Sequence, residues 1–308
     1  MKISIKIIVI LILAGNSKGM TQSIDEVLAN YFNDFKNNKL NISALTAISN
    51  YQNKSTLLSN FDRYTTDSLS EVRSEAFRLI VNLMDTKDAQ STNSLYLNYL
   101  LRGTVDKSEQ VNRIVLNKLF DYPPIHFSSG YIGKVYAATK HATDKSLYIK
   151  FIGYTGGTSY LDSLKDTQFS AMTEKEKWAL LLAQARLGDS ISIDRIVKQL
   201  DVKAGSCDQL VAMLPDFSYV KSRKVIDKLL MLSMSDERLC RAPNPSSNLM
   251  ISAGYYIIPY LSYSISLFPI EVDESGEMFD DYEDAMRKLK DWYSANSKTY
   301  RINIYSYR

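Results

Sequence analysis

Glycine and proline are scarce in this chain, with 12 and 7 residues respectively among 308. Barrels and sandwiches built from many short strands need a turn every roughly 8–12 residues, and these residues supply most of the turns. Their scarcity therefore argues against such folds and favours long helices. Hydrophobic residues make up 45% and charged residues 23%. These shares are typical of globular proteins and exclude a disordered chain or a polytopic membrane protein.

Histidine and cysteine are too few, and too far apart, to suggest a metal site. The two histidines, His126 and His141, lie 15 residues apart, and neither has a second histidine or a glutamate four residues later. A helical zinc site needs such a pair, and the two cysteines form no Cys-x-x-Cys motif. We predict no metal. His126 follows two prolines, so we interpret it as a loop or surface residue and not as a catalytic base.

Motifs that carry catalytic or cofactor chemistry are also missing. The sequence contains no phosphate-binding G-x-x-x-x-G-K-[ST] or G-x-G-x-x-G element and no G-x-S-x-G nucleophile elbow. The glycine-rich stretch at 153–158 lacks a preceding strand, so we expect a turn between helices there. Carboxylates gathered at 280–284 suit the start of a helix better than a glycosidase pair. We therefore expect no cofactor and no enzymatic activity.

The first twenty residues contain a basic start followed by a hydrophobic run. Lys2 and Lys6 precede an unbroken apolar run over 7–14, and Ser17 and Gly19 are small residues at the spacing of a cleavage site. This pattern is typical of a secretory signal peptide. A membrane anchor is the alternative, but the apolar run is far shorter than the ~20 residues that a spanning helix requires. We expect residues 1–20 to be removed and the chain to be periplasmic or extracellular, with no transmembrane segment.

Basic and acidic residues nearly balance each other in number. The formal net charge is +3, and loss of Lys2, Lys6 and Lys18 with the signal would bring it to zero. A neutral mature chain lacks the uniform attraction that draws proteins to nucleic acid, so we expect no nucleic-acid partner. Acidic residues are concentrated at 271–284, which carries eight of them and no basic residue. This acidic segment is a candidate surface for steering a basic partner.

Apolar residues recur at helical spacing through most of the chain after residue 20. Three such stripes are Ile24, Val27, Leu28, Tyr31 and Phe35; Val72, Ala76, Leu79, Ile80 and Leu83; and Ile193, Ile196, Val197 and Leu200. Short breaks separate segments of roughly 10–18 residues, which predicts paired antiparallel helices. We expect an all-α repeat domain over 21–299, irregular around 122–169, followed by an extended tail at 300–308 laid over the last helix.

Two stretches resemble HEAT repeats. Residues 70–76 contain Val72, Arg73 and Ala76 in the Val-Arg-x-x-Ala arrangement of a second repeat helix, and 179–189 resembles the Ala/Leu-rich first helix with its Gly-Asp turn. The similarity covers about half of the chain, and 122–169 departs from it. The resemblance implies a superhelical stack of antiparallel helix pairs, a HEAT-like α-solenoid, that binds other molecules. It carries over no catalytic residue.

The two cysteines are positioned to form a disulfide. Cys207 stands at the start of one expected helix, and Cys240 follows the end of the next, which we place at about 222–234. If these helices are antiparallel neighbours, the two residues lie side by side, as a bridge requires. Export would place them where disulfides persist. A pair of buried thiols is the alternative.

Tyrosine is abundant, with 21 residues, and three of them form a stripe. Tyr256, Tyr260 and Tyr263 recur at i, i+4 and i+7, beside an apolar face of Ile257, Leu261, Ile265 and Phe268. We expect Pro259 to kink this helix or to start a new one. Aromatic rings with a polar tip suit protein interfaces, so the stripe is a candidate partner surface. Packing of the tyrosines between repeats is the alternative.

These observations favour an exported, non-enzymatic binding or scaffold module with a protein partner. The alternative is an envelope hydrolase or carbohydrate-active enzyme on a helical toroid. A deep pocket joining His126 to several carboxylates would favour that alternative, and a shallow surface would count against it.

The cleavage site leads to a first testable prediction. N-terminal sequencing of the exported protein should show a mature chain that begins between Met20 and Ser23. Recovery of an intact Met1 would contradict the signal peptide.

Overall fold

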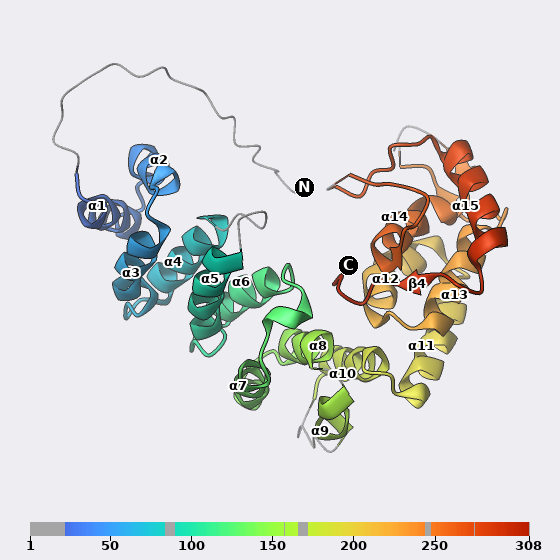
Figure 1. Ribbon diagram of the computed structural model, residues 1–308, viewed down its shortest axis with the longest axis horizontal. Helices are drawn as coiled ribbons and strands as arrows, with labels where there is room; N and C mark the ends of the chain where they lie inside the picture. Colours follow the sequence, from blue (N-terminus) through green and yellow to red (C-terminus); the bar gives the residue numbers. More distant parts are fainter. Residues whose placement is uncertain are drawn as a thin grey trace. The chain divides into compact units, whose positions relative to one another are not determined.

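The computed structural model describes residues 22–83, 90–156, 158–165, 172–243, 248–273 and 275–307, and it is all-α. The described elements are α1 (Ile24–Lys36), α2 (Ile42–Asn50), α3 (Lys54–Thr65), α4 (Ser70–Leu83), α5 (Gln90–Gly103), α6 (Glu109–Leu119), η1 (Pro124–His126), α7 (Ser129–Thr139), α8 (Ser146–Thr155), η2 (Thr158–Tyr160), α9 (Leu161–Lys165), α10 (Glu174–Arg186), α11 (Ser190–Lys203), α12 (Cys207–Val220), α13 (Arg223–Ser233), β1 (Cys240–Arg241), β2 (Met250–Ile251), α14 (Gly254–Ser264), β3 (Ile265–Ser266), α15 (Tyr282–Asn296) and β4 (Arg301–Ile302). Figure 1 shows their order. The predicted signal peptide, 1–20, lies outside the described residues.

The chain divides into two compact units, residues 1–63 and 64–308. In the first unit, a capping box formed by Ser23 and Glu26 starts α1. The α1 stripe predicted from the sequence is buried except for Phe35, which is half-buried. Phe32 of α1 meets Phe61 of α3 edge to face, with 6.3 Å between ring centroids. These rings and fully buried aliphatic side chains, among them Leu28 and Ile48, form the core of the unit.

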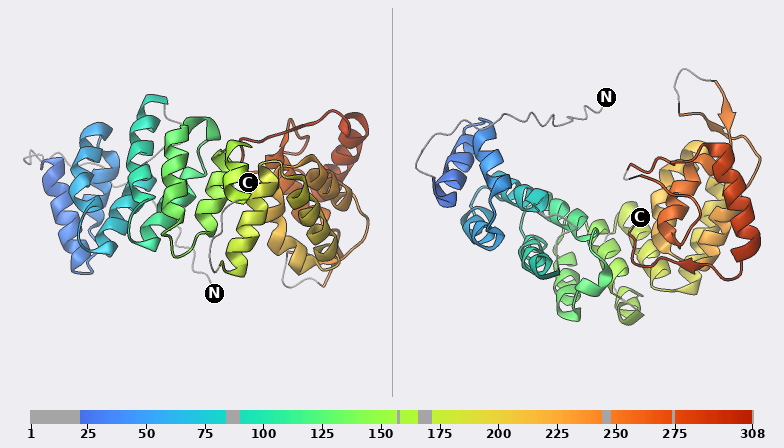
Figure 2. Two further views of the ribbon diagram at one scale, coloured as in Figure 1. Left: turned by 90° about the horizontal axis from the view of Figure 1, so that it is seen from below. Right: turned by 45° about the horizontal axis from the view of Figure 1, so that its top comes forward.

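In the second unit, helices pack against the helix two places later as well as against their sequence neighbours. Contacts join α4 to α6, α6 to α8, α8 to α10, α10 to α12 and α12 to α14. Figure 2 shows the middle helices of this unit standing next to one another. No helix in the described part of the chain combines the length and apolar character needed to cross a bilayer.

The Val-Arg-x-x-Ala stretch lies on α4, with Val72 and Ala76 buried. Arg73 forms a two-pronged ion pair with Asp106 in the loop before α6, at 2.8 and 2.9 Å. It also donates to the carbonyls of Asp67 and Ser68 at 2.9 and 3.1 Å. Both charged side chains are almost buried, at 14% and 11% exposure, so the pair fixes two loops against each other in a way that a surface pair would not.

The glycine-rich stretch was only partly a turn, because Gly153 lies inside α8 and not in a loop. A side chain at Gly153 would come within 2.4 Å of the Tyr219 hydroxyl and 2.7 Å of the Ala183 Cα and Cβ. Gly153 is therefore required for the close approach of α8 to α10 and α12. The turn begins at Gly156, the C-cap of α8.

The alternative in which a new helix starts at Pro259 is wrong. Helix α14 begins at Gly254, after the short pair β1–β2, and continues through Pro259, so no new helix starts there. Gly254 is needed because a Cβ at this position would lie 2.2 Å from the Ser233 carbonyl oxygen. The N-cap of α15 is Asp281, which accepts from the Asp284 amide, whereas Asp280 binds Lys288.

Only the first part of the C-terminal tail lies against the last helix. Tyr300 lies near Trp292 of α15, with ring centroids 5.8 Å apart. The next residues form β4, which pairs antiparallel with β3 at the end of α14. The tail then continues toward Tyr307, which packs against aromatic residues of other helices. Its path depends on contacts far away in the sequence, which periodicity does not reveal.

The predicted disulfide between Cys207 and Cys240 is confirmed. The sulfur atoms are 1.97 Å apart, and the Cα atoms are 5.1 Å apart. Cys207 is the first residue of α12, and Cys240 begins β1 after α13, as the antiparallel arrangement requires. The bridge attaches the β1–β2 segment to α12.

This bridge makes a second testable prediction. The bridge joins two residues that are 33 positions apart in the sequence. Closing a loop of this length stabilises the folded state by ~3.5–4 kcal/mol in the chain-entropy model. Reduction should therefore lower the melting temperature by roughly 10 °C, as measured by calorimetry with and without reductant. The double variant C207S/C240S should melt at the lower temperature under both conditions. An unchanged melting temperature after verified reduction would contradict this role.

Candidate partner-binding groove on helix α14

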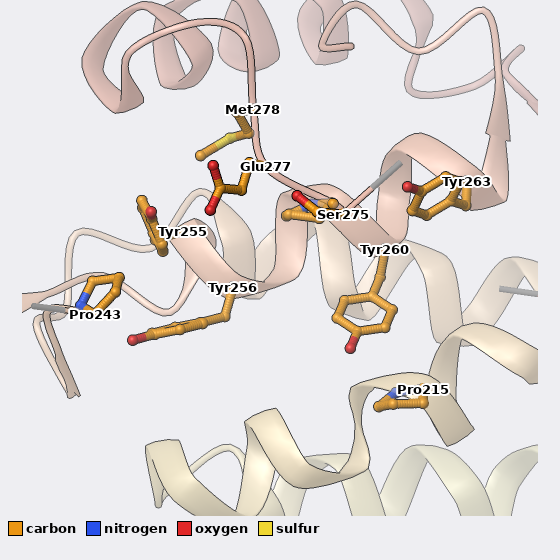
Figure 3. Close-up of a pocket in the computed structure, with 11 residues that line it drawn as sticks. Pro215, Pro243, Tyr255, Tyr256, Tyr260, Tyr263, Ser275, Glu277 and Met278 are labelled. Atoms are coloured by element: carbon orange, nitrogen blue, oxygen red, sulfur yellow. The ribbon is translucent and has the colours of Figure 1, made fainter. Parts of the chain in front are cut away.

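Tyr256, Tyr260 and Tyr263 come together along one groove of about 620 Å³. We name it the tyrosine groove; it is lined by Pro215, Pro243, Tyr255, Tyr256, Pro259, Tyr260, Tyr263, Ser275, Gly276, Glu277 and Met278. Figure 3 shows Tyr260 directed toward Pro215 of α12 and Tyr256 lying near Pro243. The lining thus combines one face of α14 with three other segments.

The helix positions these tyrosines because its opposite face is fixed in the core. Ile257 and Leu261 are fully buried, and Ile265, just after the helix, is 2% exposed. The three groove tyrosines, in contrast, are half-buried. The predicted apolar face is confirmed, except that Phe268 is half-buried and packs against Trp292.

Two tyrosine hydroxyls anchor neighbouring segments to the groove. Tyr256 donates to the Arg241 carbonyl at 2.8 Å, and Tyr263 donates to the Asp273 carbonyl at 3.0 Å. The acceptors are main-chain atoms of strand β1 and of the loop that contains Asp273, so each hydroxyl fixes a wall of the groove. The rings of both tyrosines line the groove.

The wall at 275–278 is a tight turn organised by Asp273. Its carboxylate accepts from the Ser275 amide and hydroxyl at 2.8 and 2.7 Å and from the Glu277 amide at 2.9 Å. These hydrogen bonds hold the pKa of Asp273 below its ordinary value. The turn brings Glu277, part of the acidic segment, to the rim of the groove. An apolar ligand with adjacent positive charge matches this combination.

The histidines lie elsewhere. His126 is half-buried in η1 and meets the ring of Tyr122 edge to face, with 6.4 Å between centroids. His141 lines a different cavity of about 610 Å³ that Asp106 and Glu109 also line. Both carboxylates are already in ion pairs, Asp106 with Arg73 and Glu109 with Arg113. This arrangement does not present a carboxylate ready for acid–base chemistry.

A buried Ser–Lys cluster, which the sequence analysis missed, joins α12 to α14. Lys221 donates to the Ser264 hydroxyl at 2.8 Å, and the hydroxyls of Ser264 and Ser218 are 3.0 Å apart. Both serines are fully buried, so no substrate reaches them in this structure. Burial, with a smaller contribution from the nearby Arg186 charge, lowers the pKa of Lys221 to about 6. No spacing rule connects residues this far apart in the chain.

The described residues contain no group of three or more His, Cys, Asp and Glu side chains arranged to hold a metal ion. Comparison with protein-family models, curated proteins and solved structures found no match to this chain.

Lys221 gives a third testable prediction. Between its folded pKa of about 6 and its ordinary value of 10.5, the unfolded state holds one more proton than the folded state. The lysine therefore costs most stability at low pH, and this cost falls as pH rises, by about 1.4 kcal/mol per pH unit. The variant Lys221→Met removes the titration, so its free energy of unfolding relative to wild type should fall from pH 6.5 to pH 10.

Urea denaturation of wild type and Lys221→Met at several pH values in this range measures the difference. The conservative change Lys221→Arg is the control, because it retains the charge throughout the range. A difference between wild type and Lys221→Met that does not vary with pH would contradict a depressed pKa.

Proposed function

We propose that this chain is an exported, non-enzymatic binding or scaffold module that holds a protein partner in the tyrosine groove. The groove itself carries the proposal, because it gathers the three tyrosines of the stripe beside an acidic rim. Aromatic residues are enriched in protein interfaces because they supply a large contact area at small entropic cost.

A HEAT-like superhelical stack is part of the proposal. The contacts that join α4, α6, α8, α10, α12 and α14 in succession support it. The burial of Val72 and Ala76 also supports it. Repeat stacks of this kind present extended surfaces to partners. The step from this architecture to binding is an analogy at the level of the fold.

Two features support export to the periplasm or the extracellular space. The disulfide supports it, because such bonds persist in oxidising compartments. The signal-like pattern at 1–20 supplies the route. The expected partner is an exported protein.

The hydrolase alternative has no specific observation in its favour. It calls for a deep pocket that joins His126 to several carboxylates, but His126 lines none of the five cavities described for this chain. The cavity beside His141 holds carboxylates that are already in ion pairs. We therefore do not propose a catalytic role.

A fourth prediction tests the tyrosine groove. The variant Tyr260→Ala removes the ring directed toward Pro215 and should weaken partner binding at least tenfold, or about 1.4 kcal/mol. Its free energy of unfolding should change by less than about 1 kcal/mol, because the half-buried ring lines a groove. The partner is isolated on immobilised mature chain from envelope extract, and binding is then measured by titration.

Phe279→Ala is the matched control, since this aromatic residue belongs to the acidic segment, is 71% exposed and does not line the groove. It should bind the partner as wild type does. If Tyr260→Ala instead destabilises the fold by ~2–4 kcal/mol, as ring truncation in a core does, the ring is a packing element and the interface hypothesis for this stripe is wrong.

A further inference from the structure

The last residues of the chain bind to helices far from α15. After β4, the Asn303 amide donates to the Ser264 carbonyl at 2.9 Å and extends the pairing with β3. The following residues, 304–307, lie against side chains of α8, α10 and α12. Figure 1 shows the tail leaving α15, passing through β4 and ending beside α12. We call residues 300–307 the tail segment.

Two side chains bind three consecutive backbone carbonyls of the tail segment. Arg186 of α10 donates to the Ile304 and Ser306 carbonyls at 2.8 and 3.2 Å. The hydroxyl of Tyr154 of α8 lies 2.9 Å from the intervening Tyr305 carbonyl and 2.9 Å from the Tyr122 carbonyl, so these two oxygens share its single proton. The side chains of Ile304 and Tyr305 are 55% and 56% exposed. This part of the contact therefore recognises an extended backbone without selecting its side chains.

The side chain of Tyr307 is recognised directly. The Tyr307 ring stacks on Phe120 with 3.7 Å between centroids and meets Tyr154 and Tyr219 edge to face, both at 5.7 Å. Burial in this cluster raises the pKa of the Tyr307 hydroxyl to about 12. The three rings form a pocket that suits a planar aromatic group.

The groups that hold the tail segment are fixed by contacts other than the tail. The Arg186 guanidinium lies over the rings of Tyr154 and Tyr219, at 4.9 and 4.8 Å from their centroids, and donates to the Tyr219 carbonyl. Tyr219 in turn donates to the Lys150 carbonyl at 2.6 Å. No carboxylate among the described residues pairs with Arg186, so carbonyl oxygens are its polar partners. These side chains form a preformed set of donors for the carbonyls of a peptide backbone.

We propose that this surface is a peptide-binding site, with the tail segment as its resident and displaceable ligand. Its ligand class is an extended peptide of a partner protein that offers three consecutive carbonyls to Arg186 and Tyr154 and an aromatic side chain to the pocket around Phe120. The proposal does not rest on the tyrosine groove, because different side chains form the two sites.

The test uses the full-length chain and a fluorescein-labelled peptide with the sequence of residues 299–308. In wild type the resident tail competes with the peptide, and only the fraction of molecules with an empty site binds it. The full-length variant Tyr307→Ala weakens the resident tail, so it should bind the peptide roughly 30-fold more tightly than wild type does, as measured by fluorescence anisotropy.

Matched peptides establish which contacts matter. The peptide with the change Tyr307→Ala should lose about 30-fold in affinity for the Tyr307→Ala chain, whereas Ile304→Ala in the peptide should change it by less than about threefold, since that side chain is exposed. Circular dichroism would verify that the Tyr307→Ala chain remains folded.

The proposal would be overturned if the wild-type chain and the Tyr307→Ala chain bound the unchanged peptide equally well. It would also be overturned if the Tyr307→Ala chain bound the unchanged peptide and the Tyr307→Ala peptide equally well. A wild-type chain that elutes as a stable dimer with exchanged tails would identify a second copy as the occupant and would also overturn it. Partner capture through the tyrosine groove is measured separately, so failure of one proposal leaves the other to its own test.

Discussion

The half-buried Arg186 guanidinium is the constraint on which the centre of the second unit depends. Even partial removal of a charge from water is unfavourable unless its hydrogen-bond donors find acceptors. Arg186 meets this requirement with the carbonyls of Tyr219, Ile304 and Ser306 and with the faces of two tyrosine rings. Burial still lowers its pKa. The helices that supply those groups and the tail must therefore be correctly placed together, and loss of any one of them would leave part of a charged group unsatisfied.

Close backbone contact on the same helices makes this arrangement possible. Gly153 allows α8 to approach Ala183 of α10 and the Tyr219 hydroxyl of α12. Asp216 adds a polar connection between the same three helices, because it accepts from Lys150 of α8 and from the Trp178 indole of α10. Small residues thus set the spacing, and ionic and hydrogen-bonded groups set the register. Arg73 has a comparable function earlier in the unit, but it uses a carboxylate, Asp106, where Arg186 uses main-chain carbonyls.

The sequence predicts what depends on local periodicity and fails where a residue's environment comes from distant segments. The apolar stripes of α1 and α4 and the pairing of Cys207 with Cys240 follow from spacing and helix order, and the structure agrees. Gly153 looked like a turn residue because sequence alone does not show that Ala183 lies against it. Pro259 was expected to kink its helix or to start a new one, and α14 continues through it, so the second alternative is wrong. Of the candidate site, the α14 stripe was predictable, but the walls from Pro215, Pro243 and 275–278 were not, because they come from three other segments.

The abundance of tyrosine has a structural explanation, and this explanation limits which tyrosines are candidates for a binding surface. In this chain, which is poor in glycine and proline, buried tyrosine hydroxyls connect elements by donating to distant main-chain carbonyls. Tyr148 donates to Thr104 and Tyr219 donates to Lys150, and the carbonyls of Tyr122 and Tyr305 share the single hydroxyl proton of Tyr154. Such a residue satisfies a buried carbonyl while its ring contributes apolar area, so one side chain serves both needs. Tyr256 and Tyr263 bind carbonyls in the same manner, but their rings face the open tyrosine groove and not the core. Composition alone therefore does not identify an interface; what singles out Tyr256 and Tyr263 is that their rings line an open groove.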